Sequence, residues 1–212
     1  MACSNALLSG EQHICVKCLI DLPKTYYHID NENPVVKSFW GRAPVKYAAA
    51  YYYFKKNSGV QSLLHNLKYK GQKELGERLG LMYGADLKAS DNFKTVDVIM
   101  PVPLHKKKKR QRGYNQSEHF AMGLAQSMGV MLDTKSLIKT VHTKSQTKKN
   151  RIERVKNVAE VFTLTNPQQL AGKHVLLVDD VITTGATIEA CALKLAEADN
   201  ITISVVSIAY AN

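Results

Sequence analysis

The clearest pattern along the chain is a set of aliphatic and β-branched runs of strand length. The run at residues 175–178, Val-Leu-Leu-Val, shows no polar alternation. This is typical of a strand that is buried on both faces of a parallel sheet. Residues 96–100 and 201–208 predict two more strands, the first of which ends at Pro101.

Between these runs lie segments in which apolar side chains recur with the spacing of an amphipathic helix. The predicted helices cover residues 60–69, 75–83, 117–128 and 188–198. Asn115 or Ser117 is a suitable cap for the third of them. An aromatic stretch at 45–54 predicts a strand that covers one edge of the sheet. This succession implies right-handed crossovers and an α/β fold with a mostly parallel, doubly wound sheet.

The first 35 residues differ from the rest because they are polar and interrupted by Pro23 and Pro34. Such a segment cannot build a core alone, so it needs a metal or must dock onto the larger part. We therefore expect two parts, a cysteine-rich segment at 1–35 and the α/β domain at 36–212. A chain of 212 residues suffices for one substantial core plus this appendage.

The chain is strongly basic, with a formal net charge of +11 and a pI near 9.4. Residues 106–112 contain six basic side chains of seven, and a second cluster lies between Lys144 and Lys156. This balance favours polyanionic partners, either nucleic acid or a small phosphate-rich ligand, although solvated basic faces would look the same.

Nothing in the sequence predicts membrane insertion. No stretch approaches the roughly 18 apolar residues of a membrane helix. The N-terminus also lacks the basic and apolar regions of a secretory signal. The expected location is the cytoplasm.

The most informative segment is residues 175–187, where the predicted strand ends in Asp179 and Asp180. Vicinal hydroxyls can donate hydrogen bonds to two carboxylates at such a sheet edge. The turn that follows offers backbone N–H groups, hydroxyls and a helix N-terminus to a phosphate. It consists of Thr183, Thr184, Gly185, Ala186 and Thr187.

This segment resembles the motif of type I phosphoribosyltransferases that binds PRPP (5-phosphoribosyl-1-pyrophosphate). The resemblance implies that Asp179 and Asp180 bind the 2′ and 3′ ribose hydroxyls and that residues 183–187 bind the 5-phosphate. It also implies Mg²⁺ as the cofactor that accompanies PRPP.

Further residues narrow the resemblance to the ComF/GntX family, which joins a small cysteine-rich segment to a phosphoribosyltransferase-like domain. They are the Met-Pro-Val-Pro-Leu run at 100–104, the Arg-Gly-Tyr-Asn-Gln-Ser-Glu run at 112–118, and Thr143, Gln146, Arg154, Asn157 and Phe162.

The resemblance implies a pyrophosphate loop that includes Pro101, Val102 and Arg112. The Pro101–Val102 peptide is then either cis or an ordinary strand terminator. Asn115, Gln116, Gln146, Arg154 and Asn157 match other family positions, some of them in the loop that closes over PRPP.

The cysteines indicate a metal site rather than a disulfide framework. Cys15 and Cys18 form a C-x-x-C pair, and Cys3 stands alone near the N-terminus. Zinc needs four ligands, so either a residue such as His13 or His28 completes a zinc site or the site stays without metal. Cys191 is expected to be an ordinary buried residue of the last helix.

Two functions are consistent with these features. The first is Mg²⁺-dependent transfer of phosphoribosyl from PRPP to an unidentified acceptor. The second, implied by the ComF resemblance, is a non-catalytic module that binds single-stranded DNA (ssDNA) in DNA uptake during natural transformation, together with proteins of the uptake machinery. Homo-oligomers are compatible with both.

Overall fold

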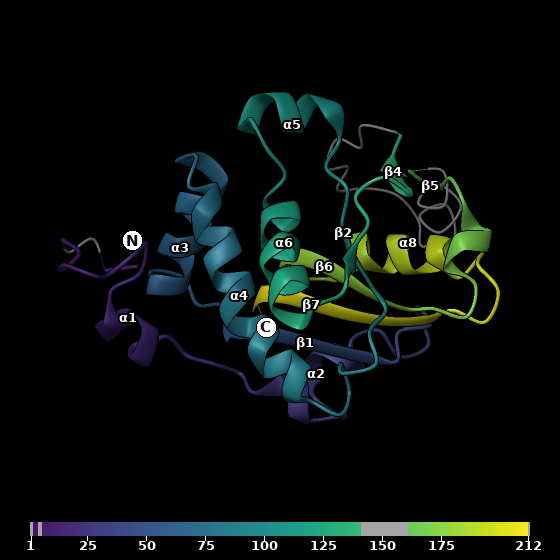
Figure 1. The fold of residues 1–212 in the computed structure, drawn as a ribbon, viewed down its shortest axis with the longest axis horizontal. Helices are drawn as coiled ribbons and strands as arrows, with labels where there is room; N and C mark the ends of the chain where they lie inside the picture. The colour runs from purple at the N-terminus through teal and green to yellow at the C-terminus, as the bar shows by residue number, and fades with distance from the viewer. Residues whose placement is uncertain (1, 4–5, 141–160, 212) are drawn as a thin grey trace.

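The computed structural model describes residues 2–3, 6–140 and 161–211. Its centre is a five-stranded sheet in the order β1-β7-β6-β2-β3, in which every neighbouring pair is parallel (Figure 1). The strands are β1 (Tyr47–Tyr53), β2 (Val98–Pro101), β3 (Met131–Leu132), β6 (His174–Ile182) and β7 (Thr202–Tyr210). The predicted α/β class and parallel sheet are thus confirmed, and β1 lies at one edge as expected.

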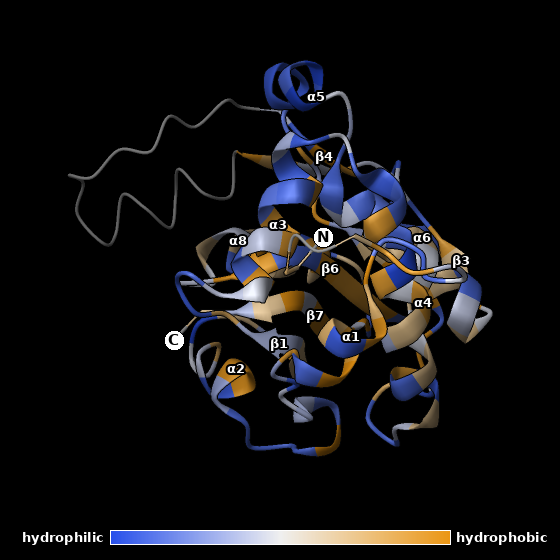
Figure 2. Cartoon of the chain, turned by 90° about the vertical axis from the view of Figure 1, so that its left-hand side faces the viewer, coloured by the Kyte–Doolittle hydropathy of each residue, from blue (hydrophilic) through white to orange (hydrophobic). Residues whose placement is uncertain are grey.

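Helices cover both faces of the sheet. One face packs against α3 (Gly59–Tyr69), α4 (Lys73–Ala89) and α6 (Gln116–Met128), and the other packs against α2 (Pro34–Lys37) and α8 (Ala186–Leu195). The interior of β6 alternates between these layers, since Leu176 and Val178 contact the first and Val175 and Leu177 the second. Figure 2 shows these apolar strands between the helices. The absence of polar alternation at 175–178 therefore reflects burial on both sides.

The first helix layer is held by an unusually close contact between α4 and α6. A Cβ on Gly80 would lie 2.2 Å from the carbonyl oxygen of Phe120, and one on Gly123 would lie 2.0 Å from that of Glu77. Only glycine allows the two backbones to approach this closely. This contact fixes α6, whose first turn lies next to β6.

The remaining elements lie outside these layers. A two-stranded antiparallel sheet joins β4 (Leu137–Lys139) to β5 (Phe162–Leu164). Helix α5 (Lys106–Arg112) stands apart from the sheet and is hydrophilic along its length (Figures 1 and 2). Two 3₁₀ turns cover Tyr27–Ile29 and Pro167–Leu170.

The N-terminal segment contains one short helix, α1 (Val16–Asp21). Ile14, Cys15, Cys18 and Leu22 pack in the same apolar cluster as α3 and α4, so the segment docks on the larger part. The boundary at residue 35 stays a prediction. Among the described residues, no helix has the length and apolar character needed to span a bilayer.

Candidate functional site

Asp179 and Asp180 lie inside β6, which continues to Ile182 rather than ending at the two carboxylates as expected. The pairing with β7 explains the difference, because it extends through Asp179↔Ser207 to Ile182↔Tyr210. The pairing with β2 ends at Pro101↔Val178. The two carboxylates therefore lie just beyond the last residue of β2 that pairs with β6, in a part of β6 that still pairs with β7.

Asp179 is held by two short hydrogen bonds to one carboxylate oxygen. The hydroxyl of Ser117 donates to Oδ1 at 2.9 Å, and the backbone N–H of Asp180 donates to it at 2.8 Å. Burial, and then repulsion from Asp180, raise the pKa of Asp179 to about 7, against the opposing effect of these hydrogen bonds. The carboxyl group retains partial solvent contact through the pocket that it lines.

Asp180 is buried, and its charge is balanced by an ion pair. The ammonium of Lys68, in the last turn of α3, lies 3.0 Å from its Oδ1. The two neighbouring carboxylates therefore differ in their partners: a hydroxyl of α6 for Asp179 and a cation of α3 for Asp180.

The turn after β6 encloses a small cavity of about 50 Å³, lined by Asp179 and residues 181–188. Gly185 has φ = +72° and precedes the first turn of α8. A Cβ there would lie 2.9 Å from the ring of Phe39, so glycine is required on both counts. Thr183, Thr184 and Thr187 are exposed. The turn thus presents hydroxyls and a helix N-terminus to a small anion.

Arg42 bonds both to the turn between β6 and α8 and to α8 itself. It donates to the carbonyl oxygen of Thr184 at 3.2 Å and forms an ion pair with Glu189 in the first turn of α8.

The loop after β2 lies beside the carboxylate pair. The N–H of Val102 donates to the carbonyl oxygen of Val178 at 2.8 Å, and the side-chain amide of Asn115 donates to that of Val102 at 3.0 Å. No described peptide is cis, so the cis alternative for Pro101–Val102 is wrong. Asn115 occupies the N-cap position of α6, as expected, but its side chain makes no capping hydrogen bond. It bonds to Val102 instead, and the Ser117 hydroxyl bonds to Asp179.

Arg112 and Gln116 contact each other, but they lie next to α3. They do not point to the turn at residues 183–187, which we call the phosphate turn. The Arg112 guanidinium donates to Oε1 of Gln116 at 2.8 Å and lies over the ring of Tyr69, 5.6 Å from its centroid. The basic run at residues 106–112 forms helix α5.

Comparison with known proteins adds to this geometry. Residues 115–211, which include α6, β6, the phosphate turn and α8, match the family described as the phosphoribosyl transferase domain. The DNA utilization protein YhgH of Escherichia coli (strain K12) is 30% identical over 139 residues, 64% of this chain and 60% of that protein. Competence protein F of Haemophilus influenzae is 31% identical over 131 residues, 59% of this chain and 57% of that protein. Competence protein ComFC of Bacillus subtilis (strain 168) is 33% identical over 103 residues, 47% and 38% of the two chains.

The chain is therefore similar to DNA utilization and competence proteins, which supports the resemblance to the ComF family. The chain spans about 60% of the length of its YhgH relatives. Among solved structures, a purine phosphoribosyltransferase from Pyrococcus horikoshii Ot3 aligns with a TM-score of 0.41 at 18% identity, covering 63% of this chain and 71% of that one.

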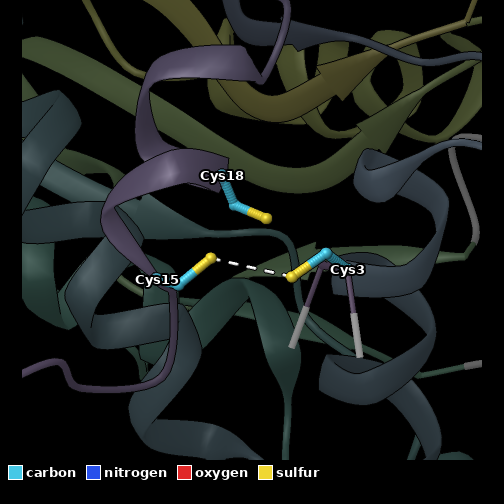
Figure 3. A group of neighbouring side chains, drawn as sticks. All are labelled: Cys3, Cys15 and Cys18. Atoms are coloured by element: carbon cyan, nitrogen blue, oxygen red, sulfur yellow. Dashed lines mark hydrogen bonds between the residues drawn. The ribbon is translucent and has the colours of Figure 1, made fainter. Parts of the chain in front are cut away.

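The three N-terminal cysteines are assembled as expected. The sulfur atoms of Cys3, Cys15 and Cys18 lie within 4.8 Å of one another, and those of Cys3 and Cys15 are 3.6 Å apart. Figure 3 shows the three thiols directed toward a common point. Thiolates that share a zinc ion at about 2.3 Å lie roughly 3.8 Å apart, so the group suits a thiophilic metal.

No fourth ligand joins the cysteine group within the described residues. His13 and His28, expected as candidates, are not part of it. His28 packs instead edge-on against Tyr83, with ring centroids 5.8 Å apart. Burial, and then hydrogen bonds to the neighbouring cysteines, raise the pKa of Cys18 to about 12, so this thiol keeps its proton unless a metal displaces it. Cys191 is buried in α8, as predicted.

Gln146, Arg154 and Asn157 lie outside the described residues. Conversely, the sequence analysis missed Lys68, Ser117 as a partner of Asp179, and Arg42. Each acts on a residue far away in sequence. Lys68 and Arg42 belong to no local motif, and the run at 112–118 does not show which residue the Ser117 hydroxyl contacts.

Proposed function

We propose that this protein binds PRPP at the Asp179–Asp180 pair and transfers its phosphoribosyl group to an acceptor. The observation that carries the proposal is that Asp179 lines a small cavity together with the turn at 183–187, and that Asp180 is its neighbour on the same strand. A ribose 5-phosphate needs such an arrangement, since its vicinal hydroxyls and its phosphate lie at opposite ends of one small sugar.

In this proposal Asp179 and Asp180 accept hydrogen bonds from the two ribose hydroxyls and so orient the ring. The exposed hydroxyls of Thr183, Thr184 and Thr187 and the N–H groups at the start of α8 hold the 5-phosphate. The loop at Val102, fixed by Asn115, lies beside the carboxylates and faces the side of the ribose that carries pyrophosphate. Catalysis then rests on positioning and on stabilising the leaving group.

Magnesium fits this site because the adjacent carboxylates repel each other, as the raised pKa of Asp179 indicates. Mg²⁺, held by oxygen atoms of PRPP beside the pair, would neutralise charge on the departing pyrophosphate. The protein's part is to hold the ribose between Asp179, Asp180 and the phosphate turn.

Calorimetric titration with PRPP and Mg²⁺ tests the proposal. The wild type should bind, and Asp179→Asn/Asp180→Asn should lose at least about 100-fold in affinity, since two charged hydrogen-bond acceptors are removed. Asp91→Asn, an exposed carboxylate paired only with Lys94, is the control and should bind as the wild type does. A wild type that does not bind PRPP would refute the proposal.

A second candidate function is binding of ssDNA. Helix α5 carries six basic side chains of seven, and residues 106–111 are exposed. The printed names of the relatives refer to DNA utilization and competence, which supports the same partner. Replacing residues 106–109 by alanine should weaken ssDNA binding and flatten its dependence on salt. Unchanged affinity and slope would exclude α5 as the DNA-binding surface.

A further inference from the structure

A second pocket, distinct from the phosphate turn, lies between the end of α3 and helix α5. Its volume is about 250 Å³, and we call it the α3–α5 pocket. Its lining residues are Lys68, Tyr69, Lys108, Gln111 and Arg112. None of them belongs to the phosphate turn or to the loop at 101–104, so this space is separate from the cavity assigned above to the 5-phosphate.

The charge of the α3–α5 pocket is one-sided. Three of its five described lining side chains are cations, one of which, Lys68, already pairs with Asp180, and none of the described lining residues is a carboxylate. Lys109, the neighbour of Lys108 on α5, already has a carboxylate partner in Glu118 at 3.2 Å. An occupant with a carboxylate or phosphate group would therefore gain charge-assisted hydrogen bonds that a neutral occupant cannot make.

The pocket also offers a flat surface. Tyr69 is 63% exposed although it is a large aromatic residue. The guanidinium of Arg112 lies over its ring, and the hydrogen bond to Gln116 fixes the orientation of that guanidinium. A tyrosine ring and a planar guanidinium both stack on unsaturated rings, so a flat aromatic ligand suits this wall.

The pocket shares a residue with the ribose site. Lys68 lines it and forms the 3.0 Å ion pair with Asp180. Asp180 is one of the two carboxylates assigned to the ribose hydroxyls, and the carbon that bears the 2′ hydroxyl is bonded to C1, where transfer occurs. The α3–α5 pocket therefore adjoins the carboxylate pair through Lys68, on a side of the ribose site from which a second reactant could approach.

We propose that the α3–α5 pocket is the acceptor site, and that the acceptor is a flat unsaturated ring carrying a carboxylate or phosphate group. The inference rests on the proposed transfer from PRPP. A lone pair on a ring nitrogen of the acceptor forms the bond to C1, and the bond from C1 to the pyrophosphate oxygen breaks. Pyrophosphate leaves with that electron pair, and any proton on the attacking nitrogen passes to solvent. Lys68 and Lys108 hold the anionic group, and Tyr69 with Arg112 holds the ring.

Nicotinate and nicotinamide are suitable probes because they share one ring and differ in charge. With PRPP and Mg²⁺ bound, calorimetry or ligand-observed NMR should show nicotinate binding about tenfold more tightly than nicotinamide, the effect of one charged hydrogen bond. Lys108→Gln should remove most of this preference. Tyr69→Leu should weaken both probes about equally, because it removes stacking and no charge.

Two control variants match these changes outside the pocket. Lys88→Gln removes an exposed cation at the end of α4, and Tyr26→Leu removes a similarly exposed tyrosine, 59% accessible. Both should bind the probes as the wild type does. Equal binding of the two probes, no binding of either, or no effect of Lys108→Gln and Tyr69→Leu would each overturn the acceptor assignment.

A PRPP titration of the same variants separates this proposal from the proposed function. If the wild type does not bind PRPP, the transferase proposal fails irrespective of the probes. If Lys108→Gln and Tyr69→Leu weaken PRPP as strongly as they weaken nicotinate, and pyrophosphate displaces nicotinate, the pocket holds the leaving group and the acceptor assignment is wrong. Retained PRPP affinity together with lost nicotinate affinity is the result that we expect.

Discussion

The phosphate turn and the cysteine segment are supported in different ways. The turn follows a strand that is buried on both faces, and its carboxylates are held by Ser117 of α6 and Lys68 of α3. The cysteine segment has one short helix, and it leaves Leu8, Val16 and Ile20 exposed. The turn and its carboxylates are therefore held by several packed elements, whereas the cysteine segment is held mainly by its contact with α3 and α4.

The largest effect should come from the helix packing that supports the site. Gly80→Ala would place a Cβ 2.2 Å from the carbonyl oxygen of Phe120, so α4 and α6 must separate. We expect a loss of about 3 kcal/mol or more in the free energy of unfolding, measured by urea denaturation. Gly76→Ala in the same helix meets first a flexible side-chain atom of Leu67, at 3.1 Å, and should cost much less. Equal losses would mean that the close approach is not what holds this layer.

Metal removal should affect the other region alone. If the thiols hold zinc, a chelator should lower the unfolding free energy by roughly 2–5 kcal/mol, less than for an isolated zinc peptide because the segment also packs on α3. PRPP affinity should stay unchanged.

Because Cys18 holds its proton without metal, zinc uptake should release protons, which calorimetry in buffers of different ionisation enthalpy detects. Cys15→Ser should abolish these effects and Cys191→Ala should not. A chelator effect that persists in Cys15→Ser would place the metal elsewhere.

The pH dependence of stability should distinguish the site from the rest of the fold. The pKa of Asp179 is raised to about 7 from an ordinary 3.8, so the folded state keeps a proton that the unfolded state loses. This group's contribution to stability is therefore complete at low pH and is lost as pH rises through about 7. Asp179→Asn should stabilise the ligand-free protein by about 1–3 kcal/mol at pH 8 and have little effect at pH 4, as thermal unfolding at both values would show. Destabilisation at pH 8 would contradict the assignment.

The smallest effect is expected for Ser117→Ala, which removes one hydrogen bond to Asp179. PRPP affinity should fall about three- to tenfold because the carboxylate loses a partner that orients it. The pKa of Asp179 should rise further, since that hydrogen bond lowers it. Titration of the Asp179 carboxyl by NMR measures this shift directly. Ser62→Ala, whose hydroxyl bonds only to a backbone oxygen of its own helix, serves as the control.

The regular elements were predictable because their apolar periodicity is local. Burial on both faces is encoded in Val175–Val178 itself, and the helical spacing at 60–69 gave α3 almost to the residue. The extension of β6 past Asp179 was not predictable, because it depends on pairing with β7. In the same way, the sequence around Asn115 and Ser117 indicates a helix start, but the tertiary contacts turn both side chains toward the site.

Only those residues of the candidate site that follow one another in the sequence were predictable. Asp179, Asp180 and the turn at 183–187 form one stretch of chain, so their proximity follows from the strand and the turn. Lys68 approaches Asp180 from a helix more than a hundred residues earlier. The apolar periodicity of α3 does not predict which strand the helix will end beside. The angle at which α3 crosses the sheet depends on the packing of the whole helix layer.

The position of β6 in the sheet has a consequence for synthesis on the ribosome. β6 lies between β2 and β7, and β7 in turn pairs with β1, whose other edge bonds to residues 23–25. A nascent chain that has exposed β1, β2 and even both aspartates still lacks the strand that holds them. The Asp179–Asp180 site should therefore form only after β7 leaves the exit tunnel, and until then the edges of β1 and β6 that pair with β7 are exposed to association with other chains.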